Sequence, residues 1–493
     1  MGVIPISFFV RKDYKLFCTS RRKKTRMKIH FLGANRQVTG SRYCIETKTS
    51  RLMIDCGLFQ EREYTGRNWN TSTIPPKSLT AMLLTHAHID HTGLVPRMIK
   101  EGFNAPIMAS QPTVDLANIL LKDAAKIQRE DANYKKRRHK KQGKKSRYPI
   151  EPLYEIDDVE KTLGMLQGVE YHKPTAVTDD ITVTFHDAGH ILGSAFLELK
   201  VQEDGEERTI LLSGDIGQNG KPLIRDPDTL NHTDVLIMES TYGDRDHTKS
   251  EHDVETQLEN IINETVKAGG KTIIPTFAVE RAQEIMYHIA RLVDGKRIPE
   301  IEVYLDSPMA VDVTKVFRNH RDCLDEETWE LISSGTPPLK FPGLHMSRSV
   351  EESKRINEMN TPCVIMSTSG MCTAGRIKHH LKRCLPSERN TILFVGYQAN
   401  GTLGRQILDG REKVRIHGKQ RDVRASIRQI HGFSGHADRN GLIEWSGNFG
   451  KSPKQVFLTH GDEDAAEALA ADLRATRNWN VTIPHYQSTH DLV

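Results

Sequence analysis

The 493-residue chain is 37% hydrophobic, 27% charged and 6% aromatic, a balance that suits two or more domains with ample buried cores. No apolar run approaches the roughly 18–20 residues that cross a membrane as a helix. The seven cysteines are scattered, odd in number and without a Cys-x-x-Cys pair, which argues against a disulfide framework or a thiolate zinc site and favours a reducing, cytoplasmic setting.

The net charge of +5 is concentrated in two segments. Residues 135–147 carry nine Lys or Arg and no acid, and residues 1–26 carry eight basic residues against Asp13, so the rest of the chain is acidic. Such runs attract the phosphate backbone of nucleic acids through counterion release. For residues 135–147 a solvated loop is an equally good interpretation.

The first 26 residues do not read as part of the fold. Their apolar piece, residues 3–10, precedes the basic cluster, which is the reverse of the order in a secretory signal. We expect a basic extension that is disordered or not native, with the fold beginning at Met27.

Residues 27–85 predict short strands separated by Gly-rich turns, including one at 28–32 and one at 51–55. Helices are predicted at 93–100 and 114–128, followed by the basic loop 135–147. Strands resume at 181–185, 195–200 and 208–213, where apolar and polar residues alternate or form short apolar runs. Strands that precede helices in this way are typical of an αββα sandwich.

A second pattern occupies the middle of the chain. A helix predicted at 254–266 ends at Gly269-Gly270, a usual helix stop. Strands and helices then alternate, with strands at 272–277, 301–305, 363–366 and 391–395. Strands spaced by helices imply right-handed crossovers and a parallel sheet. The sequence therefore predicts a whole α/β domain inserted into the first one.

The run Thr85-His86-Ala87-His88-Ile89-Asp90-His91 places four metal-ligand side chains directly after the apolar segment 81–84. Imidazole suits zinc, and a carboxylate can bind a second ion. A solvated, His-rich loop without metal is the alternative, and it is the weaker one because partner residues follow downstream.

Those partners are His190, Asp215 and His460, each of which follows a strand-like segment. Strand ends are rigid enough to hold a metal site. We expect two ions bridged by Asp215. Each ion would keep an open position for a shared water. The expected ligands of one ion are His86, His88 and His190, and those of the other are Asp90, His91 and His460.

This pattern resembles the metallo-β-lactamase superfamily, and more narrowly its β-CASP branch of nucleases. Bacterial and archaeal homologues of the cleavage subunit of the polyadenylation machinery are the nearest in pattern, and RNase J is more distant. Glu239 in Glu-Ser-Thr-Tyr-Gly and His436 in Gly-Phe-Ser-Gly-His-Ala-Asp match two further β-CASP signatures. The resemblance implies an α/β fold, an αββα sandwich formed by residues 27–243 and 430–493 with a β-CASP domain inserted at 244–429.

The resemblance also implies an activity. Two Zn²⁺, or Mn²⁺, would activate a shared water that attacks RNA phosphodiester bonds and leaves a 3′-hydroxyl and a 5′-phosphate. His436 would protonate the leaving oxygen and Glu239 would orient it, with Asp90 also at the catalytic centre. Asp55 would support the metal loop without binding metal.

Substrate residues follow from the same resemblance. The segment Ser369-Gly370-Met371 and Arg376 lie between a predicted strand and the helix predicted at 377–385, where small residues let a phosphate approach backbone N–H groups. A plain β–α turn is the alternative for this segment. His460 is the RNA-branch residue at a position that is apolar in DNA-processing relatives, so single-stranded RNA is the expected partner.

Two other functions stay open at this point. One is a metallo-hydrolase of small esters or thioesters, which the large insertion disfavours. The other is an inactive RNA-binding scaffold, which the intact ligand set disfavours. The sequence leaves undecided whether a nuclease would act as an endonuclease or also as a 5′→3′ exonuclease. A homodimer is an expectation from the resemblance alone.

Overall fold

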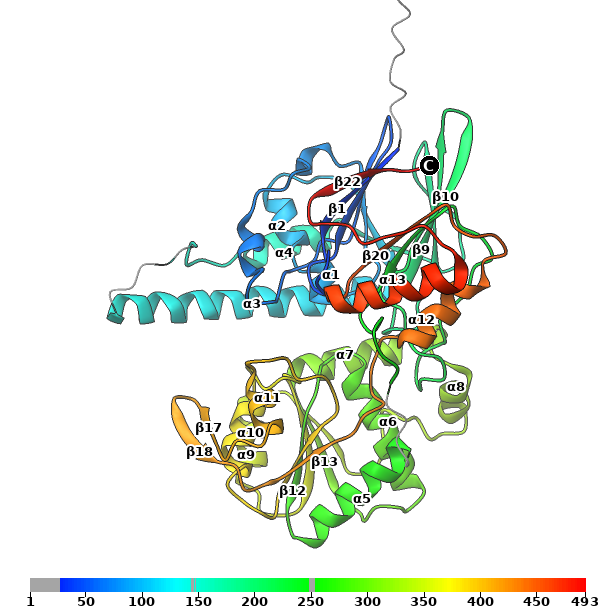
Figure 1. Ribbon diagram of the computed structural model, residues 1–493. Coiled ribbons are helices and arrows are strands. Elements are labelled where there is room, and N and C mark those ends of the chain that lie inside the picture. Colours follow the sequence, from blue (N-terminus) through cyan, green and yellow to red (C-terminus); the bar gives the residue numbers. More distant parts are fainter. Residues whose placement is uncertain (1–26, 143–145, 147, 248–252) are drawn as a thin grey trace, which may run out of the picture.

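The computed structural model describes residues 27–142, 146, 148–247 and 253–493, so the expected extension 1–26 lies outside the described residues. The chain forms two lobes (Figure 1). Segments from both ends of the chain build the upper lobe, and the middle of the chain builds the lower one.

The upper lobe contains two seven-stranded sheets packed face to face. The first has the order β22 (Ser488–Asp491), β1 (Lys28–Gly33), β2 (Arg42–Glu46), β3 (Arg51–Ile54), β4 (Ala81–Leu83), β5 (Ile107–Ser110) and β6 (Leu166–Val169). The second has the order β21 (Val481–Thr482), β20 (Gln455–Thr459), β11 (Val235–Glu239), β10 (Glu206–Leu212), β9 (Ala195–Glu203), β8 (Ile181–Asp187) and β7 (Thr175–Thr178). Their inner faces share one apolar core, to which Phe31, Leu197 and Phe457 contribute.

Helices cover both outer faces of this pair of sheets. One side carries the 3₁₀ turns η1 (Thr65–Trp69) and η2 (Pro76–Ser78) and the helices α1 (Ile89–Thr92), α2 (Val95–Lys100), α3 (Gln111–Gln142) and α4 (Ile156–Leu163). The other carries α12 (Arg439–Trp445), η4 (Ser446–Asn448) and α13 (Glu463–Arg477). The expected αββα sandwich is confirmed.

The lower lobe is built on a six-stranded sheet in which every described pairing is parallel. Its order is β14 (Leu344–Ser347), β13 (Glu302–Asp306), β15 (Cys363–Ser367), β12 (Lys271–Pro275), β16 (Thr391–Phe394) and β19 (Ser426–Gln429). The crossovers contain α5 (Val254–Lys267), α6 (Arg281–Asp294), α7 (Pro308–Asn319), η3 (Arg321–Cys323), α8 (Glu326–Ser333), α9 (Val350–Glu358), α10 (Ile377–Cys384) and α11 (Leu403–Leu408), with a hairpin of β17 (Lys413–Ile416) and β18 (Lys419–Asp422). The predicted parallel sheet is confirmed.

One prediction about an element was wrong. The basic run was expected to be a loop from residue 135, but α3 is 32 residues long and continues to Gln142. Buried Leu116, Leu121 and Ala125 anchor its first half. Lys, Arg and Gln are good helix formers and neither Gly nor Pro occurs between 113 and 142, so the helix propagates past its packed part. Its basic end projects from the body (Figure 1).

The two lobes share an apolar cluster. Ala87 and Leu192 of the upper lobe pack in it with Ala278 and Val279 of the lower lobe. Ion pairs join the lobes as well, for example His320 with Asp115, whose Nε2 and Oδ2 atoms lie 2.7 Å apart. The inserted lobe is thus packed against the loops that follow β4 and β8. Over the described part of the chain, no helix combines the length and the apolar character needed to span a membrane.

Candidate metal centre

The segment from the end of β4 through α1 carries the four candidate ligands that are close in sequence, His86 and His88 in the loop and Asp90 and His91 in α1. Backbone hydrogen bonds hold this segment in place: the Ser41 N–H donates to the Asp90 carbonyl at 2.9 Å, and the Cys56 N–H donates to the His91 carbonyl at 2.7 Å. The Gly57 backbone packs directly against the Asp90 carbonyl. A Cβ at Gly57 would lie 1.6 Å from that oxygen, so only glycine fits there.

The other three candidates come from loops at the ends of second-sheet strands. His190 follows β8, Asp215 follows β10 and His460 follows β20. The Nδ1 atom of His190 lies 2.9 Å from the Gly435 carbonyl oxygen, which fixes the ring so that Nε2 faces inward. The structure thus brings together all seven residues that the sequence singled out.

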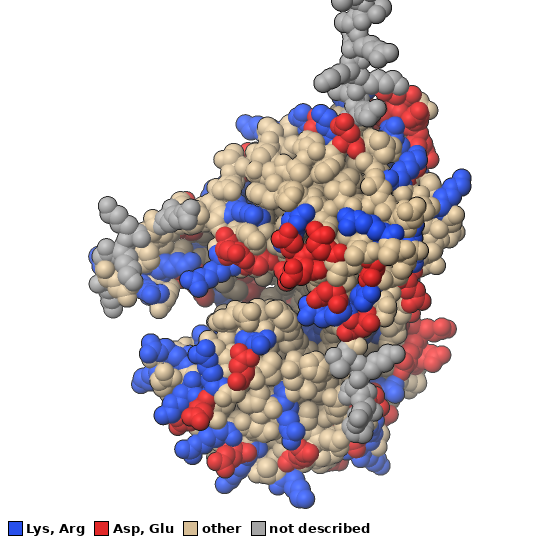
Figure 2. Space-filling view, in the orientation of Figure 1, with Lys and Arg blue, Asp and Glu red and all other residues tan. Residues whose placement is uncertain are grey.

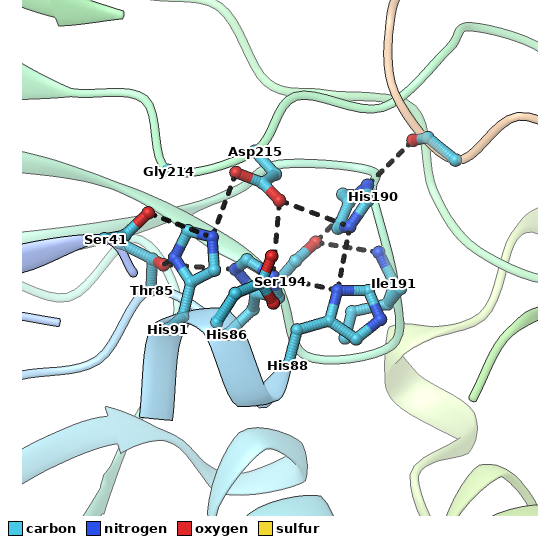
Figure 3. Close-up of polar contacts among 12 residues, drawn as sticks. Ser41, Thr85, His86, His88, His91, His190, Ile191, Ser194, Gly214 and Asp215 are labelled. Atoms are coloured by element: carbon cyan, nitrogen blue, oxygen red, sulfur yellow. Dashed lines mark hydrogen bonds and ion pairs between the residues drawn. The ribbon is translucent and has the colours of Figure 1, made fainter. Parts of the chain in front are cut away.

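These side chains form two adjacent groups. Figure 3 shows the first group, with Asp215 and His91 beside it. In the first, His88 Nδ1 lies 3.1 Å from His86 Nε2 and 3.2 Å from His190 Nε2. The Oδ2 atom of Asp215 completes it, 3.5 Å from His86 and 3.6 Å from His190.

In the second group, the Nε2 atoms of His91 and His460 lie 3.1 Å apart. Asp90 Oδ2 lies 3.7 Å from His460 Nε2, and Asp215 Oδ1 lies 3.3 Å from His91 Nε2. The two oxygens of the Asp215 carboxylate therefore face different groups.

The donor chemistry fits a metal ion. Burial and the neighbouring imidazoles hold the pKa of His86 and of His190 well below the ordinary value, which leaves neutral rings with lone pairs to donate. Asp215 Oδ1 is buried and accepts no hydrogen bond from the described residues, an arrangement that costs free energy unless a cation is bound. Imidazole nitrogens with carboxylate oxygens suit zinc and related divalent ions.

Asp55 lies behind the ligand loop. Its carboxylate accepts hydrogen bonds from the Thr85 N–H and the Thr85 hydroxyl, both at 2.8 Å, and its Oδ2 lies 2.7 Å from His91 Nδ1. A carboxylate on the far nitrogen of an imidazole sets its tautomer and orientation. Asp55 thus contacts His91 on the side away from His460.

His436 and Glu239 form a pair beside the first group. His436 Nδ1 lies 3.1 Å from Glu239 Oε2, and the His436 ring centroid lies 4.4 Å from that of His190. Burial alone would lower the pKa of His436, but the Glu239 carboxylate outweighs it and raises that pKa to about 9. The Glu239 carboxylate thus favours the protonated form of this imidazole.

Sequence reasoning missed Thr241. Its hydroxyl donates to Glu239 Oε2 at 2.5 Å and lies 3.1 Å from His460 Nδ1, so it links the His436 pair to the second group. Its position two residues after Glu239 was the available signal, but a threonine there is too common to stand out.

The four predicted substrate residues lie in the lower lobe, at the carboxyl end of β15. The Ser369 hydroxyl accepts a hydrogen bond from the Thr373 N–H at 3.0 Å, which shapes a tight local turn. The Arg376 guanidinium donates to Asp306 Oδ1 and to the Arg348 carbonyl, both at 2.7 Å. That guanidinium is therefore committed to protein groups, while Ser369 and Met371 are half-buried and Gly370 is buried.

Three family models match the chain. They are a metallo-beta-lactamase superfamily domain over residues 44–226, a Beta-Casp domain over 282–407, and a Zn-dependent metallo-hydrolase RNA specificity domain over 420–484. The last of these spans both His436 and His460.

Relatives align over most of the chain. Ribonuclease TTHA0252 of Thermus thermophilus is 38% identical over 93% of this chain and 99% of its own. The transcription termination factors FttA of Methanosarcina mazei and Methanocaldococcus jannaschii are 33% and 32% identical, over 92% and 91% of this chain and 70% and 69% of their own.

A solved structure has the same fold at low identity. A crystal structure of a protein of unknown function from Enterococcus faecalis superimposes with a TM-score of 0.54 and 14% identity, covering 94% of this chain and 99% of that one. With these matches and the geometry above, the chain belongs to the β-CASP branch of the metallo-β-lactamase superfamily.

Proposed function

We propose that this protein is a metal-dependent ribonuclease that hydrolyses phosphodiester bonds of single-stranded RNA and leaves a 3′-hydroxyl and a 5′-phosphate. The observation that carries the proposal is the Asp215 carboxylate between two ligand groups, with the His436–Glu239 pair beside them. The 38% identity to a protein named as a ribonuclease and the match to an RNA specificity domain support RNA as the substrate.

The ligand assignment follows the two groups. His86, His88 and His190 would hold one ion, Asp90, His91 and His460 the other, and Asp215 would contact both. Zinc is the proposed metal and manganese the alternative. Metal ions held there would lower the pKa of a water and neutralise charge on the phosphate. Asp55 would keep His91 oriented for this task.

His436 is proposed to act as the general acid. A leaving 3′-oxygen needs a proton, and the His436 imidazole, whose pKa Glu239 raises to about 9, is 21% exposed. Glu239 holds the ring through Nδ1, which leaves Nε2 free to donate. Glu239 is itself fixed, because Oε1 accepts the Ile216 N–H at 2.6 Å.

The proposal extends to organisation and mode of action. We place the domain boundaries at 27–243, 244–429 and 430–493, with the inserted domain presenting Ser369, Gly370 and Met371 as a wall for the RNA. Endonuclease cleavage is the proposed mode, with 5′→3′ exonuclease activity as a second mode to be assayed. A cytoplasmic homodimer is the proposed state.

The test is cleavage of an internally labelled single-stranded RNA, with analysis of the product ends. We expect fragments with 3′-hydroxyl and 5′-phosphate termini, and loss of cleavage on chelation that returns when zinc or manganese is added. A protein that binds metal and hydrolyses thioesters but leaves RNA intact would instead be a small-ester hydrolase. Binding of RNA without cleavage in either metal would point to a scaffold.

A further inference from the structure

Phe277 is exposed where an aromatic ring is expected to be buried. It follows β12 at the carboxyl end of the parallel sheet and is 41% exposed, while its neighbours Thr276 and Ala278 are buried. A second exposed ring, Tyr397, follows β16 at the same edge of the sheet and is 63% exposed. Strands β12 and β16 are paired neighbours, so two aromatic side chains face solvent along one rim.

The Phe277 ring lies on a floor of two glycines. A Cβ at Gly370 would lie 2.8 Å from two carbons of the ring, and a Cβ at Gly396 would lie 3.5 Å from it. The Gln398 amide donates to the Gly370 carbonyl at 3.0 Å and to the Gly396 carbonyl at 3.2 Å, which ties the two glycine segments together. Backbone thus supports one side of the ring while part of its surface stays open to solvent.

The residues that follow Phe277 contact the loops that hold metal ligands. Glu280, three residues after Phe277, accepts a hydrogen bond from the Leu192 N–H at 3.1 Å, and Leu192 is two residues from His190. Ala278 and Val279 pack in one cluster with Leu192 and with Ala87 of the ligand loop. Because three residues of chain reach about 11 Å at most, the Phe277 backbone lies close to that contact.

We propose that Phe277 is a stacking platform for one unpaired nucleobase of the RNA, next to the bond that is cut, with Tyr397 as the neighbouring ring. Every base has a π-face, so an exposed ring on a rigid floor binds bases with little regard to sequence. A base must leave its helix to stack there, so the platform selects single strands over duplexes. This inference rests on the proposed ribonuclease function and names the part of its substrate that the lower lobe holds.

The test couples a protein change to a substrate change. Kinetics are measured for the wild type and for Phe277→Ala on RNAs in which each base flanking the cut is replaced in turn by an abasic site. On intact RNA we expect Phe277→Ala to raise KM by roughly 5- to 150-fold, the usual range for one base–aromatic stack. At one abasic position we expect the KM of the wild type to rise by the same factor. The KM of Phe277→Ala should not rise further at that position, because this variant already lacks the ring that the missing base would stack on.

Two variants distinguish stacking from a structural role. Phe277→Trp should retain a low KM, and its fluorescence should be quenched by RNA carrying 2-aminopurine at the sensitive position. Gly370→Ala should raise KM in the same direction as Phe277→Ala, because the added Cβ would displace the ring. Trp329 on α8 is an aromatic residue of similar exposure (38%) on a different element of the same lobe, so Trp329→Ala serves as the matched control.

The possible failures are separable. If Phe277→Ala and the abasic substitutions have additive effects at every position, the ring does not contact a base and the inference is wrong while the ribonuclease function stands. If intact RNA is not cleaved by the wild type in zinc or manganese, the proposed function fails and this inference fails with it. An effect of Phe277→Ala on a protein partner alone, with RNA kinetics unchanged, would also overturn it.

Discussion

The Asp215 side chain connects the two groups of candidate metal ligands. Its Oδ2 faces His86 and His190, and its Oδ1 lies 3.3 Å from His91. Burial alone would raise the pKa of this carboxyl, but His460, His91 and His86 around it hold that pKa well below the ordinary value. The carboxylate is thus charged, buried and shared between the two groups.

We predict close to two metal ions per chain in the wild type and loss of most of them in Asp215→Ala. The physical reason is that the substitution removes an oxygen from both groups at once. Metal analysis by mass spectrometry after preparation without chelator checks this. Asp180→Ala is the control, because it removes a hydrogen-bonded carboxylate next to the opposite end of β8. Wild-type protein that binds neither zinc nor manganese would contradict the assignment.

His436→Ala is predicted to separate chemistry from metal binding. Metal content should stay at the wild-type level, because His436 contacts Glu239 and is not in either ligand group. RNA cleavage should fall by roughly 10²–10⁴-fold, the usual contribution of a general acid. If metal and activity are lost together, His436 is a metal ligand and its assignment as the general acid is wrong.

At the scale of elements, α3 and the hairpin of β17 and β18 carry positive charge on opposite sides of a recess. Figure 2 shows Lys and Arg on the projecting helix and on the lower lobe beneath it, with the recess between the two lobes opening toward that side. The exposed basic residues include Lys135, Lys136, Arg137, Arg138 and Lys140 at the projecting end of α3, and Lys413, Arg415 and Lys419 on the hairpin. A single strand that leaves the metal centre on this side would pass between them.

We predict that the basic end of α3 contributes to RNA affinity but not to chemistry. Replacing its five exposed Lys and Arg by Gln keeps the helix and removes the charge. Affinity should fall and the salt dependence should flatten, because each phosphate contact on a single strand contributes about −0.7 to the slope of log K against log salt. Turnover at saturating RNA should stay nearly unchanged.

Binding titrations at several salt concentrations measure that slope. Lys122→Gln is the control on the same helix, because Lys122 pairs with Glu160 at 3.0 Å in the anchored half of α3. An unchanged affinity and slope in the five-residue variant would mean that the projecting helix does not touch RNA. RNA binding would then depend on the lower-lobe residues near Ser369 and Phe277.

At the scale of the whole molecule, buried polar contacts fix the two lobes relative to each other. Lys221 of the upper lobe donates to Glu284 of the lower lobe at 2.8 Å, and Glu280 accepts the Leu192 N–H. Burial, with the nearby Glu284 carboxylate, raises the pKa of Glu280 from an ordinary 4.5 to about 8. The interface therefore contains a carboxyl group that is neutral at pH 7.

This raised pKa makes stability depend on pH. Between about pH 4.5 and pH 8 the folded state keeps a proton on Glu280 that the unfolded state loses, so this group's contribution to the free energy of unfolding falls as pH rises and is constant above pH 8. The slope is at most about 1.4 kcal/mol per pH unit. Glu280→Gln keeps an acceptor for the Leu192 N–H and removes the titration.

We therefore predict that Glu280→Gln has a larger free energy of unfolding than the wild type above pH 8. At pH 5 this difference between the two proteins should be smaller. Urea unfolding of both proteins at each pH, with the same metal content, gives the difference directly. A stability difference that stays constant from pH 5 to pH 9 would show that Glu280 does not change its charge on unfolding in this range.

The sequence by itself determined the class of the fold and the candidate ligands. Alternation of apolar residues and strand–helix spacing are local properties, so the αββα sandwich and the inserted parallel sheet could be predicted from them. Four candidate ligands share one short run, and His190, Asp215 and His460 each follow a strand. Such residues stand out without knowledge of the packing.

Only the tertiary structure decided what depends on neighbours distant in sequence. The opposite orientation of the two Asp215 oxygens, the commitment of Arg376 to Asp306 and the open ring of Phe277 are set by contacts between segments tens to hundreds of residues apart. The continuation of α3 beyond residue 135 depended on how firmly its first half is buried. Local patterns specify secondary structure, but side-chain exposure and direction are decided by packing, and those decide which groups can meet a substrate.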